Sequence, residues 1–188
     1  MALVLVVTCS FAAPNAPLQS QLAAAEQGPP QVGESASNFN LLSVDGQSVH
    51  LAAQLAEGPI VLLVLRGYPG YQCPVCSRQV GQYLAQAARF AAQNARVVMV
   101  YPGPSGELKA RAEEFIEGKT LPKGFVLALD PDYTFTQAYN LRWEAKNETA
   151  YPSTFVIGKD GKVRFAKISR THGDRTTPAD VLAALAEK

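Results

Sequence analysis

The chain has 188 residues, the usual size of one globular domain. With 47% apolar and 18% charged residues, it is too hydrophobic and too balanced in charge to be a mostly disordered protein. Its 17 basic and 16 acidic residues give a net charge of +1, whereas proteins that bind nucleic acid through its phosphates normally carry a basic excess. We therefore expect one folded domain and no nucleic-acid partner.

The first 31 residues are predicted to be a lead-in to the domain, which then spans residues 32–188. The apolar run at residues 2–7 is far shorter than the roughly 20 residues of a bilayer-spanning helix, so no membrane-spanning segment is expected. This run and the small residues after it are typical of a secretory signal, although no positive residue precedes it. We expect export to the periplasm or another extracytoplasmic compartment, or a cytoplasmic location if the segment is not a signal. Lipid modification of Cys9 is a less favoured alternative.

From residue 32 onward, the chain alternates between short β-rich runs and helical patterns, which is typical of an α/β fold. Residues 60–65 are a continuous run of Val, Leu and Ile, as expected of an interior strand buried on both faces. Asp45-Gly46 and Asp160-Gly161 indicate hairpin turns, because these residues tolerate positive φ. The predicted strands are residues 39–44, 47–51, 60–65, 96–101, 125–129, 154–157 and 163–168.

Four helices are predicted between and after these strands. Residues 75–93 lack internal Pro and place apolar residues at helical spacing, so they are expected to form the longest helix. A second helix begins near Ser105, which we expect to be its N-cap. Residues 133–139 are predicted to form a short helix. Thr177 is the expected N-cap of a last helix, with Pro178 in its first position.

One motif carries chemistry: Cys73-Pro74-Val75-Cys76, placed directly after a buried strand and in the first turn of the long predicted helix. Two sulfurs at this spacing can close a small disulfide ring. The helix N-terminus presents free N–H groups and the positive end of its dipole, and Arg66 and Arg78 add positive charge nearby. A thiol with an ordinary pKa of about 8.5 can then be ionised at neutral pH, and the thiolate is the reactive form. The motif therefore predicts redox chemistry.

Other interpretations of the pair are less favoured. A zinc site needs four ligands, and the remaining candidates, Cys9, His50 and His172, are isolated in the sequence. Two inert buried cysteines or a purely structural disulfide are also open. Residues 170–175, around His172, are expected to be a solvated connector. No Gly-rich phosphate loop is present, so we expect no nucleotide, flavin, metal or other cofactor.

Short motifs along the chain also match a known family. They are Val32-Gly33-Glu34, Arg66-Gly67, Cys73-Pro74-Val75-Cys76 and Tyr151-Pro152-Ser153-Thr154-Phe155. Through them, residues 32–185 resemble the thioredoxin-fold redoxins of the alkyl hydroperoxide reductase and thiol-specific antioxidant group, in particular its peroxiredoxin-like branch with a CPxC-type pair. The resemblance implies a thioredoxin-like α/β sandwich: a mixed central sheet, helices on both faces and an added N-terminal β-hairpin. It leaves the oligomeric state open.

The resemblance further implies a catalytic site built on Cys73, Cys76, Pro152 and Arg66. Pro152 is expected to be cis and to face the cysteine pair, and the electrons are expected to come from a thiol donor such as a thioredoxin-type protein. An Arg that the family places close to the Pro152 strand is replaced here by Ser153.

Two assignments of the attacking sulfur stay open. Peroxiredoxins have a Pro, then three residues, a Thr or Ser, two residues and the peroxide-attacking Cys. In this chain, Pro69 and Cys76 match the first and last of these positions, and Cys73 takes the place of the Thr or Ser. Thioredoxins instead attack with the first Cys, here Cys73, which we expect at the exposed start of the helix and with the lower pKa. Peroxide reduction and disulfide reduction are both compatible with the motif. A non-catalytic peptide-binding or redox-sensing module is the alternative function.

Overall fold

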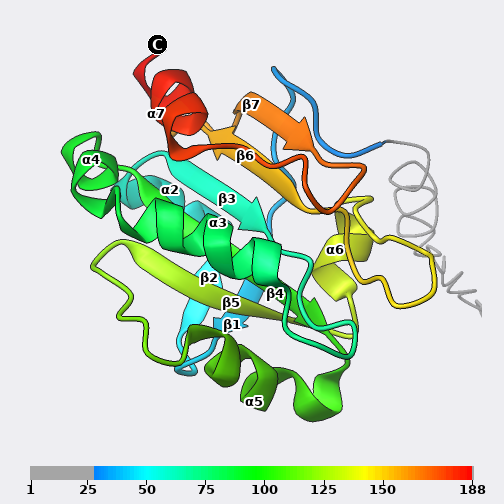
Figure 1. The fold of residues 1–188 in the computed structure, drawn as a ribbon. Coiled ribbons are helices and arrows are strands. Elements are labelled where there is room, and N and C mark those ends of the chain that lie inside the picture. The colour runs from blue at the N-terminus through cyan, green and yellow to red at the C-terminus, as the bar shows by residue number, and fades with distance from the viewer. Residues whose placement is uncertain (1–27, 188) are drawn as a thin grey trace, which may run out of the picture.

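The computed structural model describes residues 28–187 of the chain (Figure 1). The predicted signal segment, with Cys9, lies outside the described residues. Within them, no helix has the length and hydrophobicity that crossing a bilayer would require.

A seven-stranded mixed sheet forms the centre of the described domain, in the order β2-β1-β5-β4-β3-β6-β7. β3, β4 and β5 run parallel, so their carboxyl ends meet at one edge of the sheet. The two predicted hairpins flank this parallel centre as antiparallel pairs, β1 with β2 and β6 with β7. The strands are β1 (Asn40–Ser43), β2 (Ser48–His50), β3 (Ile60–Val64), β4 (Arg96–Gly103), β5 (Phe125–Pro131), β6 (Ser153–Ile157) and β7 (Val163–Ile168).

Helices cover both faces of the sheet, and α3 crosses in front of the strands in Figure 1. Side chains of α3, α4, α5 and α7 pack on one face, and those of α2 and α6 pack on the other. The helices are α2 (Leu51–Glu57), α3 (Pro74–Leu84), α4 (Ala87–Ala92), α5 (Ser105–Ile116), α6 (Thr134–Ala138) and α7 (Pro178–Ala186). The α/β architecture with helices on both faces is therefore confirmed.

Strand β3 shows why the sheet needs both layers. Val61 and Leu63 face the core under α3, while Leu62 and Val64 face the core under α2 and α6. Successive side chains of a strand point to opposite faces, so a continuous apolar run requires cover on each side. All five residues of β3 are buried, as the sequence predicted.

The structure differs from the sequence prediction in three helices. Residues 75–93 form two helices, α3 and α4, because the chain turns at Ala85 and Gln86, and α5 is the longer element. Beyond this turn, the buried Phe90 stacks on Tyr83 with ring centroids 5.6 Å apart, so aromatic packing prevails over the helix propensity of the Ala-rich segment.

The other two differences concern helix starts. The predicted strand 47–51 ends at His50, and Leu51 begins α2, a short helix that the prediction missed. Leu51 and Leu55 form its buried apolar side. Ser105 is the first residue of α5 rather than its cap; Pro104 is the N-cap, and the Ser105 N–H donates to Asp132 Oδ1 at 2.9 Å. The predicted cap at Thr177 is confirmed.

Candidate redox site

The cysteine pair lies where the chain passes from β3 into α3. Gly67 makes this passage possible: its φ is +70°, and a Cβ there would lie 1.9 Å from the Pro102 carbonyl oxygen. Cys73 then takes an extended conformation, as a residue before proline prefers, and Pro74 opens α3, where its missing N–H costs nothing. Cys76 follows as the third helical residue.

Cys73 is the N-cap of α3. Its Sγ accepts the backbone N–H of Cys76 at 3.3 Å. Both thiols are free and belong to the core between α3 and the sheet, with Cys73 3% and Cys76 0% exposed. The expectation that Cys73 would be exposed was wrong, because the helix start that carries it packs into this core.

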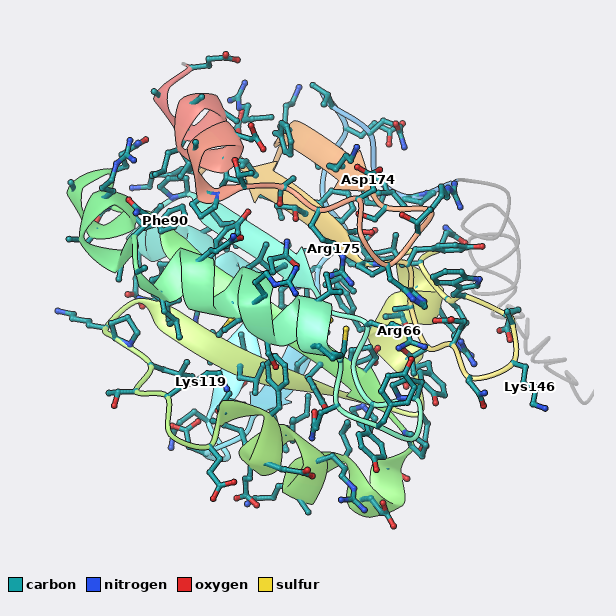
Figure 2. The ribbon with its side chains drawn as sticks, in the orientation of Figure 1. Arg66, Phe90, Lys119, Lys146, Asp174 and Arg175 are labelled. Carbon is teal, nitrogen blue, oxygen red and sulfur yellow. The ribbon has the colours of Figure 1, made fainter. Side chains whose placement is uncertain are left out.

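Two further donors reach the second sulfur. The backbone N–H of Arg66 donates to Cys76 Sγ at 3.4 Å, and Nη2 of Arg175 donates to it at 3.6 Å. Figure 2 shows both arginines beside the N-terminal end of α3, Arg66 from the segment after β3 and Arg175 from the segment before α7. Cys76 Sγ therefore lies between two segments that are far apart in the sequence.

The two thiols have opposite pKa shifts. Hydrogen bonds from the thiol and the backbone N–H of Cys76, together with the charges of Arg175 and Arg66, lower the pKa of Cys73 to about 5 against the effect of burial. Cys76 donates to Cys73 and is fully buried, so its pKa is raised, even though Arg175 opposes that shift. These opposite shifts favour Cys73 as the ionised sulfur of the reduced pair.

Arg66 does not point its guanidinium at the cysteines. The side chain is buried, and its Nε donates to Glu148 Oε2 at 2.7 Å, with further bonds to the Tyr71 hydroxyl and the Asn147 carbonyl, both at 2.7 Å. Arg66 thus acts on the pair in two ways: its backbone N–H donates to Cys76 Sγ, and its positive charge lowers the pKa of Cys73. Arg78, the other predicted source of positive charge, is exposed on α3, whereas the guanidinium of Arg175 contacts Cys76 Sγ.

Arg175 is held in place by two hydrogen bonds of its own and by those of the next residue. Its Nη1 donates to Gln79 Oε1 at 3.1 Å and its Nε donates to the His172 carbonyl at 2.8 Å. The hydroxyl of the next residue, Thr176, lies 2.8 Å from both the Tyr83 hydroxyl and Thr154 Oγ1. The segment 170–175 is largely exposed, as expected of a solvated connector, but the half-buried Arg175 also makes it part of the site through its contact with Cys76.

Pro152 precedes β6 and is buried, but its peptide bond is trans, since the described residues contain no cis peptide bond. The expected cis proline is thereby corrected. Main-chain hydrogen bonds hold the chain on both sides of Pro152. The Tyr151 N–H donates to the Leu141 carbonyl at 2.8 Å, and the Pro152 carbonyl accepts the Ser169 N–H at 2.9 Å.

Glu148 is the residue that sequence reasoning missed most completely. One carboxylate oxygen binds Arg66, and the other lies 2.9 Å from His172 Nε2. The His172 ring also contacts Trp143, which stacks on Tyr151 with centroids 4.8 Å apart. Burial opposes ionisation of Glu148, yet the hydrogen bonds from Arg66 and His172 lower its pKa. No local spacing signals Glu148 or Arg175, because both act through contacts with distant parts of the chain.

A cavity of about 440 Å³ lies beside the cysteine loop, at the carboxyl ends of β3, β4 and β5. Ligands commonly bind at this edge of a parallel sheet. Residues 68–70, the start of α5 and four residues of the 142–148 loop line it, and neither cysteine does. Among its charged lining residues, Arg111 pairs with Glu107, and Glu148 pairs with Arg66. In the described part of the chain, no three His, Cys, Asp or Glu residues form a potential metal site.

The model of the AhpC/TSA family matches residues 32–166, which is most of the chain. The chain belongs to the AhpC/TSA family. It is therefore a redoxin, with a thiol-dependent redox function of the peroxidase type. A comparison with curated proteins found no match.

Solved structures show the same fold. The peroxidoxin BcpB of Mycobacterium tuberculosis is 23% identical with a TM-score of 0.63, over 83% of this chain and 96% of that one. A yeast mitochondrial 1-Cys peroxiredoxin is 18% identical with a TM-score of 0.64, over 81% and 73%. The mitochondrial 2-Cys peroxiredoxin of Plasmodium falciparum is 18% identical with a TM-score of 0.63, over 82% and 92%. The thioredoxin-like fold implied by the sequence is thus confirmed.

Proposed function

We propose that Cys73 and Cys76 cycle between dithiol and disulfide, and that this cycle reduces peroxide or disulfide substrates. The observation that carries the proposal is the cap of α3: the backbone N–H of Cys76 donates to Cys73 Sγ at 3.3 Å, and the two thiols also hydrogen-bond to each other at this helix N-terminus. This placement favours a thiolate on the first sulfur and leaves the second within reach to close a ring.

With peroxide as substrate, the Cys73 thiolate attacks one peroxide oxygen and the O–O bond breaks. The departing oxygen takes up a proton and leaves as water or an alcohol, and Cys73 becomes a sulfenic acid. The Cys76 sulfur, on losing its proton, attacks the Cys73 sulfur, the S–O bond breaks and water leaves. A donor dithiol then returns the pair to the reduced state by two thiol–disulfide exchanges.

With a disulfide as substrate, the first step and the leaving group of the second step differ. The Cys73 thiolate displaces one sulfur of the substrate as a thiol and forms a mixed disulfide. Cys76 then attacks the Cys73 sulfur, which releases the second substrate thiol and closes the Cys73–Cys76 bond. The low pKa of Cys73, about 5, supports this order of attack.

A second assignment has its own support. Arg175 donates to Cys76 Sγ at 3.6 Å, and the Arg66 N–H donates to the same atom at 3.4 Å. These donors favour negative charge on Cys76, which is also the sulfur that matches the peroxiredoxin spacing from Pro69. In this alternative, Cys76 attacks peroxide and Cys73 resolves the sulfenic acid.

The proposed electron donor is a thiol protein of the thioredoxin type or a small thiol. In the yeast mitochondrial neighbour, the thiol is resolved via glutathione and thioredoxin systems. The buried cysteines of this chain would require such a donor to reach the helix start of α3, next to the half-exposed Tyr71.

The proposal is tested by stopped-flow mixing of the reduced protein with peroxide, followed through Trp143, the single tryptophan. The wild type is expected to form an intramolecular Cys73–Cys76 disulfide, whereas C76S stops at a sulfenic acid that dimedone traps on Cys73. Fast reaction of C73S with slow reaction of C76S would establish the second assignment. If the wild type keeps both thiols free with peroxide and with a disulfide substrate, the chain is a non-catalytic module and the proposal fails.

A further inference from the structure

Glu148 connects the two segments that donate hydrogen bonds to Cys76. Its side chain is 11% exposed, and each carboxylate oxygen has a different partner: Oε2 binds Arg66 Nε at 2.7 Å, and Oε1 lies 2.9 Å from His172 Nε2. We propose that Glu148 is a positioning residue that sets the reactivity of the Cys73–Cys76 pair by fixing both of these segments. This inference rests on the redox function proposed above.

The first connection runs through Arg66. The carboxylate of Glu148 fixes the Arg66 guanidinium, and the backbone N–H of the same residue donates to Cys76 Sγ at 3.4 Å. Because the Arg66 side chain is only 3% exposed, it has little water to replace a lost carboxylate. Without Glu148, Arg66 is expected to move, and the N–H that faces the sulfur moves with it.

The second connection runs through His172. Its ring binds Glu148, and its backbone carbonyl accepts Nε of Arg175 at 2.8 Å, while Nη2 of Arg175 reaches Cys76 Sγ at 3.6 Å. His172 is thus joined to Glu148 through its side chain and to Arg175 through its main chain. The two connections end on one sulfur atom, although Arg66 and Arg175 lie on opposite sides of Glu148 in the sequence.

The charge of Glu148 by itself would act in the opposite direction. A carboxylate near a thiol disfavours the thiolate, so a purely electrostatic role predicts that its removal lowers the thiol pKa values and speeds the reaction. A positioning role predicts the reverse, because displacing Arg66 and Arg175 moves away both the positive charges that lower the pKa of Cys73 and the donors to Cys76 Sγ. The direction of the change therefore separates the two roles.

The experiment compares E148Q with E144Q. Glu144 belongs to the same loop, its side chain is 75% exposed, and it lies 3.7 Å from Arg142, so this control makes the same change in charge outside the network. The reaction with peroxide is measured by stopped flow, and the pH profile of iodoacetamide labelling is measured for each cysteine. E148Q is expected to react about tenfold more slowly, in line with the cost of a small misplacement at a reacting group. In E148Q, the pH at the midpoint of Cys73 labelling is expected to rise, whereas in E144Q it is expected to stay unchanged.

A milder variant covers the case in which E148Q folds poorly. The side chain of His172 is 43% exposed, so H172A removes one partner of Glu148 at less cost to the core. We expect it to slow the reaction and raise the labelling midpoint in the same direction as E148Q, by less.

The outcomes separate this inference from the proposed function. If the wild type forms the disulfide while E148Q and H172A match E144Q in rate and labelling midpoint, the positioning role is wrong and the redox function stands. A lower midpoint in E148Q also overturns it, in favour of a purely electrostatic role. If the wild type forms no disulfide, the proposed function fails.

Discussion

Cys73 and Cys76 are joined through the start of α3, where the Cys76 N–H donates to Cys73 Sγ at 3.3 Å. An N-cap is usually an oxygen of Ser, Thr, Asp or Asn, which accepts an N–H of the first turn. Here a sulfur takes that position, so the residue that begins the helix is also a residue of the redox pair. Ionisation of Cys73 strengthens the cap, because the first turn of a helix favours negative charge.

The first prediction concerns which sulfur is ionised. Since the pKa of Cys73 is lowered to about 5 and that of Cys76 is raised, limiting iodoacetamide at about pH 6 is expected to label Cys73 almost alone. Peptide mapping of the reduced protein gives the distribution of the label. Label concentrated on Cys76 would contradict the assignment and make Cys76 the better candidate for attack on peroxide.

The second prediction follows from the pH dependence of stability. The folded pKa of Cys73, about 5, lies below that of an unfolded thiol, about 8.5. The ionised Cys73 therefore stabilises the reduced fold fully above the unfolded pKa, and this contribution is lost as the pH falls through the folded pKa. The disulfide form has no such group. As the pH is lowered from about 8.5 to about 5, the Tm of the reduced protein is expected to decrease relative to that of the oxidised protein.

Thermal unfolding of both redox forms across this range measures the effect. The C73S variant serves as the control, because it has no ionisable group at the cap. A Tm difference that is independent of pH would show that Cys73 is not ionised in the folded protein.

The third prediction concerns Arg175, whose Nη2 lies 3.6 Å from Cys76 Sγ. A hydrogen bond to a charged group contributes about 1.5 kcal/mol or more, so R175A is expected to slow the reaction with peroxide about tenfold. The matched control is R170A, which removes an exposed guanidinium of the same segment that stacks on Tyr151 instead, 4.7 Å from the ring centroid. Equal rates for R175A and R170A in stopped flow would exclude this role for Arg175.

The fourth prediction concerns a helix cap. Thr177 Oγ1 accepts the Asp180 N–H at 3.3 Å, and the Asp180 carboxylate accepts the Thr177 N–H at 2.9 Å, which completes a capping box. T177A is expected to lower the free energy of unfolding by about 1 kcal/mol. In a domain of this size, that change lowers the Tm by about 2–4 °C.

Ser105 offers the matched control for this cap. It starts α5 without a capping side chain, so S105A is expected to change the free energy of unfolding by less than about 0.5 kcal/mol. Chemical denaturation of both variants measures the difference. A cost in S105A as large as that in T177A would mean that Ser105 caps α5 after all.

The strands were the most predictable part of the fold. The apolar run of β3 and the two hairpins could be recognised from the local sequence. A half-buried strand has an apolar residue at every second position, and a fully buried strand has a continuous apolar run. Helix ends were less predictable. The turn at Gln86 between α3 and α4 contains no Gly or Pro, and it follows from how Tyr83 and Phe90 pack on each other.

The sequence by itself determined that this chain is an α/β redoxin with a cysteine pair at a helix start, because that chemistry depends on two sulfurs three positions apart. Only the tertiary structure decided what surrounds the pair. Arg175 reaches Cys76 from 99 positions away, and Arg66 reaches Glu148 across 82. Such contacts leave no periodic trace in the sequence, since they depend on where the loops at the sheet edge come together. The burial of Cys73 has the same origin: a local pattern locates the helix start, whereas the packing of the sheet and helices determines how much water reaches it.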